Sequence, residues 1–241
     1  MMSIFNCLFR VQGKNILKSP IVCPVKNDRP LCPSCGYDLE VIPKRKKKCP
    51  SCGQPIYIKG TPDNRTKRLM TEKQAKDAEE QWDLYNTRQS SISTVCLLGC
   101  DESDIEKERA HGAKNDHEAV RSIATRVSAS SQDLHTLKMA FLILANCAAE
   151  AGKPFRHFIV EAHRCELRHY KLTGVVKKVE IVISKQRDIC IECQSNNGKI
   201  YDIDEALQVM PLPCPKCTCV GVGGEVGFCG CYYLPMLPES G

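Results

Sequence analysis

The chain has 241 residues and a net charge of +6, and 42% of its residues are hydrophobic and 26% charged. This composition excludes a disordered chain and a membrane-embedded one. The longest mainly apolar stretch, residues 139–149, is about half the roughly 20 residues that a membrane-spanning helix needs. Residues 1–10 have too few apolar side chains for a secretory signal. We therefore expect a soluble, cytoplasmic protein with no membrane partner.

Charge and cysteine are unevenly distributed along the chain. Residues 1–68 contain fourteen Lys and Arg against four acidic residues, so the basic excess lies in the first quarter. Of the seventeen cysteines, four lie within residues 32–52 and seven within residues 190–231. Without a secretory signal, such clusters favour metal binding over disulfides. The basic part favours a polyanionic or acidic partner.

The first cluster follows a leader, residues 1–30, that we expect to be flexible. It consists of two identical CPSCG motifs whose thiols are Cys32, Cys35, Cys49 and Cys52. A CxxC turn places two thiolates on one side of an ion, and the following glycine can adopt the positive φ that closes the turn. Two such turns complete a four-sulfur site with no open position for catalysis. Reduced, unligated cysteines or a redox CxxC are the alternatives.

This segment, residues 31–59, resembles the zinc-ribbon family, which implies a structural zinc ion held between two knuckles. The hairpin between the knuckles carries an uninterrupted basic run, made of Lys44, Arg45, Lys46, Lys47 and Lys48. Such a run can bind nucleic acid through its phosphates, without sequence readout, or bind an acidic protein surface. It can also be a solvated loop that offsets the negative charge of a zinc tetrathiolate. Only Tyr37 and Tyr57 lie nearby, which gives a single-strand binder little to stack on.

A helical region follows a turn-rich basic linker, residues 60–70. Thr71 and Gln74 form a capping-box pattern that predicts a helix over residues 72–88, interrupted by residues 89–101. A second capping box at 103–106 and an apolar face over 120–127 predict further helices.

Two stronger helices are predicted over residues 133–151 and 154–172. Gly152 and Pro154 stop the first helix, so the pair is expected to form an antiparallel hairpin. Alternating apolar residues then predict a strand over residues 175–183. The helical domain is therefore expected to cover residues 71–174, and the strand with the second cysteine cluster residues 175–241.

The second cluster contains two CxxC pairs separated by 20 residues, and these four thiols form the predicted second zinc site: Cys190, Cys193, Cys214 and Cys217. Three more cysteines offer alternatives for the second pair, so the ligand set stays open: Cys219, Cys229 and Cys231. Unligated reduced cysteines are the alternative to metal. We expect two zinc ions for the whole chain.

Residues 190–235 resemble the cysteine-rich tails of uncharacterised bacterial proteins and the C-terminal end of phage head-morphogenesis (minor head) proteins. The matching residues are Cys190, Cys193, Gly198, Lys199 and Tyr201, whereas Cys214 stands near the place of an expected histidine. This resemblance implies an origin in a phage or mobile element and no mechanism.

The histidines do not form a catalytic pattern. His157, His163 and His169 are six residues apart, which spreads them around a helix. Cys165 and His169 can touch on that helix, but no third group completes a site. Asp116 and His117 form the dipeptide of some zinc-ribbon nucleases, without the downstream Asn and His that such a site needs. No phosphate-binding glycine loop is present.

The sequence thus predicts an α+β protein with an N-terminal zinc ribbon, a helical middle domain and a C-terminal strand plus small zinc-binding module. Its predicted function is non-enzymatic: two structural zinc modules, with nucleic acid bound by the basic ribbon. A phage or mobile-element assembly or adaptor protein, with zinc modules that contact proteins, is the alternative, and a zinc-supported nuclease is a weaker one.

Overall fold

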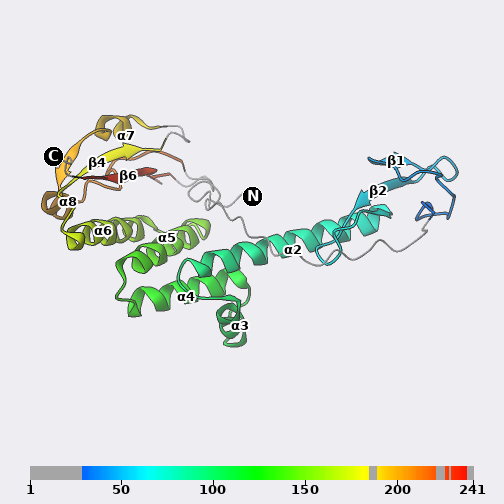
Figure 1. The fold of residues 1–241 in the computed structure, drawn as a ribbon, viewed down its shortest axis with the longest axis horizontal. Helices are drawn as coiled ribbons and strands as arrows, with labels where there is room; N and C mark the ends of the chain where they lie inside the picture. Colours follow the sequence, from blue (N-terminus) through cyan, green and yellow to red (C-terminus); the bar gives the residue numbers. More distant parts are fainter. Residues whose placement is uncertain (1–28, 185–188, 221–225, 228, 238–241) are drawn as a thin grey trace. The chain divides into compact units, whose positions relative to one another are not determined.

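The computed structural model describes residues 29–184, 189–220, 226–227 and 229–237, so most of the expected leader lies outside it. Within this part, seven helices and two small antiparallel sheets confirm the predicted α+β class (Figure 1). The chain forms two compact units, which we call the N-terminal unit and the C-terminal unit. Their boundary falls within one helix, between Ser90 and Ser91.

The N-terminal unit contains a three-stranded sheet in the order β1-β2-β3, with β1 (Lys47–Lys48), β2 (Pro55–Lys59) and β3 (Arg68–Met70). Ile56 on β2 is fully buried and packs with Cys32 and Cys49. The segment expected to be only a linker ends in β3. Its turn-rich, basic composition hides this strand, which forms because Met70 is buried against the following helix.

Helix α2 (Glu72–Cys96) begins at the predicted capping box. The Thr71 backbone N–H donates to Gln74 Oε1 at 2.9 Å, and the Gln74 N–H donates to Thr71 Oγ1 at 3.3 Å. The interruption predicted over residues 89–101 is wrong for 89–96, where the helix continues for two more turns, and confirmed for 97–101, which are not helical. Ser91 and Thr94, which locally favour a break, are buried on this helix, and tertiary packing overrides their weak helix propensity.

Three helices follow α2 along the chain: α3 (Glu102–Ala110), α4 (Asp116–Ser130) and α5 (Leu134–Glu150). The capping box of α3 pairs Asp101 with Asp104, two residues before the predicted one. The apolar face expected over 120–127 is buried, and Ile123 is fully so. These helices share one core with the end of α2.

Helix α6 (Arg156–Thr173) packs along α5, as predicted for a hairpin, with Ala149 and Ile159 in a shared cluster. It ends at Gly174, whose φ of 69° is the left-handed conformation of a helix C-cap. No helix in the described part of the chain combines the length and the apolar character needed to cross a membrane.

The second sheet has the order β5-β4-β6, with β4 (Lys178–Ile183), β5 (Ile200–Asp202) and β6 (Cys231–Met236). The predicted strand corresponds to β4, and its Val179 and Ile181 are buried. Two short helices, α7 (Ile191–Asn196) and α8 (Ile203–Val209), complete this region (Figure 1). Ile183 pairs with Cys231, which fixes where the last cysteine lies.

Candidate metal centres

The four cysteines of the N-terminal unit lie together, with all sulfur atoms within 4.8 Å of one another. The Cys32 and Cys52 sulfurs are 3.9 Å apart, and those of Cys35 and Cys49 are 3.7 Å apart. A regular tetrahedron with metal–sulfur bonds of about 2.3 Å has edges of about 3.8 Å. This group, which we call site N, can therefore hold one tetrahedral metal ion.

Site N is formed by two turns with the same geometry. The Gly36 N–H donates to the Cys32 carbonyl at 2.9 Å, and the Gly53 N–H donates to the Cys49 carbonyl at 2.9 Å. Both glycines have the expected positive φ, 74° and 73°. Backbone N–H groups of Cys52 and Ser51 lower the pKa of Cys49 to about 6, whereas burial and hydrogen bonds with Cys35 and Cys49 raise that of Cys52 to about 12, so Cys49 ionises before Cys52.

The basic run leads from the loop between the knuckles into β1, an edge strand, and all five side chains are exposed. Among the described residues, none of the five forms an ion pair with a carboxylate. The ammonium of Lys46 lies 4.4 Å from the ring centroid of Tyr57, and a hydrogen bond with Tyr57 raises the pKa of Lys46. In the described part of the chain, the run thus presents positive charge without a carboxylate partner beside site N.

The tail cysteines, by which we mean the seven within residues 190–231, form two groups. In one, which we call site C1, the sulfurs come from Cys190, Cys193, Cys217 and Cys219. In the other, site C2, they come from Cys193, Cys214, Cys229 and Cys231. All sulfurs within each site lie within 4.8 Å of one another, and Cys193 belongs to both.

The four thiols predicted to form one second site are therefore divided. Cys190, Cys193 and Cys217 lie together in site C1, whereas Cys214 lies in site C2. The structure also includes in these sites the three cysteines whose role the sequence left undecided: Cys219 in site C1, and Cys229 and Cys231 in site C2. The signal that sequence offered was their number, because seven cysteines are more than one tetrahedral site uses.

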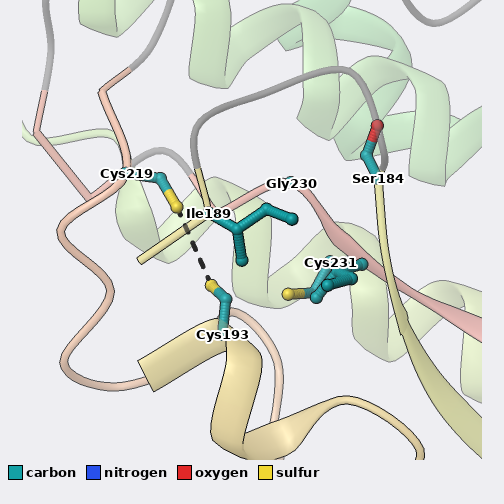
Figure 2. Close-up of a pocket in the computed structure, with 7 residues that line it drawn as sticks. Ser184, Ile189, Cys193, Cys219, Gly230 and Cys231 are labelled. Carbon is teal, nitrogen blue, oxygen red and sulfur yellow. Dashed lines mark hydrogen bonds between the residues drawn. The ribbon is translucent and has the colours of Figure 1, made fainter. Parts of the chain in front are cut away.

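Several elements position the tail cysteines. Cys193 lies on α7, and Figure 2 shows its sulfur directed at Cys219, 3.9 Å away, with Cys231 on the other side. Ile183, Ile189 and Gly230 line the small cavity next to these sulfurs. Ser184 is the polar residue of this lining, and the isoleucines give the sulfurs partly apolar surroundings.

Hydrogen bonds support both tail sites. The Cys214 N–H donates to the Cys229 sulfur at 3.4 Å, and the Cys219 N–H to the Cys217 sulfur at 3.4 Å. Hydrogen bonds from Cys214 and Cys231 hold the pKa of Cys229 well below its usual value, and the same bonds raise the pKa of the two donor thiols, so one thiolate is shared among the three. Arg156 at the start of α6 donates from Nη2 to the carbonyls of Pro213 and Cys214, at 2.7 and 2.8 Å. These contacts orient the loop that supplies Cys214.

The histidines and the remaining described cysteines lie outside these groups. His117 Nε2 is 2.7 Å from Glu150 Oε2, and His163 Nδ1 is 3.5 Å from Glu166 Oε2. Burial raises the pKa of Cys147 to about 11 and also raises that of Cys165, so both favour the neutral thiol. These buried thiols are packing residues.

An all-thiol ligand set suits zinc among the common biological divalent ions. The sulfur spacing and the closed, four-ligand arrangement fit a structural ion, because no coordination position is left for a substrate. No protein-family model, curated protein or solved structure matches this chain.

Proposed function

We propose that this is a non-enzymatic zinc-binding protein with structural zinc at both ends, which binds nucleic acid through the basic run beside site N. The observation that carries the proposal is the set of five exposed basic side chains, none with a carboxylate partner among the described residues, on a loop whose end is anchored by a site-N cysteine, Cys49. Such a surface binds phosphates by charge and counterion release, without reading sequence.

The basic run depends on metal for its position. Apart from the cysteines, the buried core next to site N is Ile56, with Leu39 and Leu69 partly buried against it. This is too little apolar surface to order the module alone, so metal binding supplies the folding free energy. Removing the metal is therefore expected to release the basic loop and weaken binding to nucleic acid.

A competing explanation is that the lysines protect an edge strand. Lysine on an exposed edge prevents pairing with a second chain, and Lys47 and Lys48 form the whole of β1. This role predicts aggregation when the charge is removed and no contact with phosphate. The dependence of nucleic-acid binding on salt separates the two explanations.

The test is fluorescence anisotropy with labelled mixed-sequence duplex and single-stranded oligonucleotides over a series of salt concentrations. The variant replaces all five basic residues of the run by Gln. The matched control replaces five exposed basic residues of the C-terminal unit by Gln: Lys153, Arg168, Lys177, Lys178 and Lys216. Cys35→Ser, which removes one ligand of site N, tests the dependence on metal.

We expect the five-residue variant to weaken binding to all sequences about equally. It should also reduce the magnitude of the slope of log K against log salt concentration, by about 0.9 for every basic side chain that contacts a duplex phosphate in the wild type. The control variant should keep the wild-type slope. Equal slopes for the wild type and the five-residue variant would contradict the proposal.

A second candidate function, that of an assembly or adaptor protein, rests on two exposed apolar side chains of the same loop. Val41 is 74% exposed and Ile42 55% exposed, next to the basic run. Contiguous exposed apolar side chains rimmed by polar residues are a feature of protein-contact surfaces, and these two adjacent residues form the start of such a patch. Changing both to Ser should leave nucleic-acid affinity unchanged, and a loss of self-association in light scattering would favour this candidate.

A further inference from the structure

The tail cysteines provide seven sulfurs for two four-ligand groups, and one sulfur belongs to both. We propose that the tail binds two zinc ions as a single binuclear cluster, in which the thiolate of Cys193 bridges the ions. This inference rests on the proposed zinc binding by the tail and is independent of nucleic-acid binding.

The central position of Cys193 is the first argument. Its sulfur lies 3.6 Å from that of Cys217 and 3.9 Å from that of Cys219, both in site C1. It also lies 3.8 Å from that of Cys229, in site C2. These are the sulfur–sulfur distances of tetrahedral zinc thiolates, about 3.8 Å. A thiolate with several lone pairs can complete both tetrahedra, so neither site needs another ligand.

The number of ligands is the second argument. Two tetrahedral ions have eight coordination positions, and the seven tail cysteines fill them all when one thiolate is shared. No histidine, carboxylate or water is needed, and no cysteine of the tail is left over. A single ion would use four of the seven and leave three thiols within the same buried cluster.

Burial and hydrogen bonding form the third argument. Cys193 is 1% exposed and Cys214 is not exposed at all, so their sulfurs depend on protein or metal for compensation once ionised. Seven thiolates carry more negative charge than two divalent ions neutralise. The structure supplies N–H donors to these sulfurs, including Asn196 Nδ2 at 3.7 Å from the Cys214 sulfur. Arg156 adds a positive charge beside the same loop.

The competing explanation is that the sulfurs are simply buried, reduced thiols around one ion. Free cysteine packs well as a small apolar side chain, as Cys147 and Cys165 do here. Those two, however, lie outside any group of sulfurs. A binuclear cluster requires all seven tail sulfurs to lie in two groups of four that share one sulfur, as they do here, whereas packing alone does not require it.

The direct test needs no substitution. The full-length protein is loaded with cadmium-113 in place of zinc, and its cadmium NMR spectrum is recorded. Two cadmium ions that share a thiolate couple to each other through the sulfur, so we expect two tail resonances that split one another. The ion in site N should give a third, uncoupled resonance.

Native mass spectrometry of zinc-loaded variants provides the count. We expect three ions in the wild type, because there are three groups, and one ion in Cys193→Ser, which removes a ligand of both tail sites. Cys35→Ser and Cys231→Ser should each lose one ion from their own site. Cys165→Ser, a buried cysteine outside the groups, is the matched control and should lose none.

Two results would overturn the proposal: two ions in the wild type, or three ions whose tail resonances are uncoupled. Three ions with coupling in the wild type would support it even if Cys193→Ser failed to fold. Failure of Cys35→Ser to lose an ion would contradict the proposed ribbon site and leave the tail cluster unaffected, so the two proposals fail separately.

Discussion

Arg156 joins α6 to the loop that supplies Cys214, and its replacement tests whether a group outside the metal ligands tunes zinc affinity. Both of its hydrogen bonds come from one nitrogen, Nη2, and reach the carbonyls of Pro213 and Cys214. Arg156→Met keeps much of the side-chain volume and removes the donor and the charge. We expect this change to weaken zinc binding at site C2 and to leave site N unchanged.

The magnitude follows from the contacts. A hydrogen bond from a charged donor contributes about 1.5–3 kcal/mol when its partner cannot be replaced. Arg156 is partly exposed, so water can replace part of each hydrogen bond. The combined contribution of the two bonds therefore lies near the lower end of this range. Groups that orient metal ligands typically change affinity about 10- to 100-fold, which corresponds to about 1.4–2.7 kcal/mol.

The assay is zinc release to a chromogenic chelator, followed over a range of chelator concentrations. Performing it in a Cys35→Ser background silences site N, so that only tail ions are counted, and a parallel Cys193→Ser background leaves only site N, which Arg156→Met should not affect. Arg164→Met is the matched control, because Arg164 is also on α6 but pairs with Glu161 of the same helix. Release of zinc at the same chelator concentration, within twofold, from the Arg156 variant and the control would refute this reasoning.

Three further predictions concern stability. Burial raises the pKa of Glu166, but hydrogen bonds and charge from His163 and Lys138 outweigh burial and keep this pKa below its usual value. The ionised carboxylate therefore stabilises the fold above about pH 4. This stabilisation is lost as the pH falls through the lowered pKa. Glu166→Gln should therefore lower the free energy of unfolding, measured in urea at pH 7, by about 1–3 kcal/mol. A difference in this free energy between variant and wild type that stays the same in acid would contradict the prediction. In Gly53→Ala the new methyl group meets no neighbouring atom, but the residue must keep a φ of 73°. The free energy of zinc binding at site N should therefore become less favourable by about 1–2 kcal/mol. Chelator competition measures this loss, and the control Ser51→Ala should keep the wild-type zinc affinity. Chelation of all metal should unfold the cysteine modules and leave most of the helical circular dichroism, because the core shared by α3, α4 and α5 contains no site cysteine; loss of most helix would contradict that division.

The helices show which sequence signals were sufficient. The hairpin of α5 and α6 was predictable because Gly152 and Pro154 interrupt two long apolar stripes, and local signals of this kind need no partner. The end of α2 was not predictable, because Ser91 and Thr94 favour a break locally and are kept helical by burial. The strand β3 was hidden for a related reason, since it exists only through pairing with β2, where Met70 lies opposite Tyr57.

The metal ligands divide in the same way. The sequence by itself determined site N, because each CPSCG turn is closed by its own glycine and only two such turns are available to meet. It also determined that the tail has more thiols than one ion uses. Only the tertiary structure decided how those thiols are grouped. Pairing of β4 with β6 brings Cys231 to the cluster, and the packing of α7 places Cys193 between the two groups. Such contacts join residues far apart in sequence: Cys193 and Cys229 are 36 positions apart, and Ile183 and Cys231 are farther still, so spacing along the chain does not encode them.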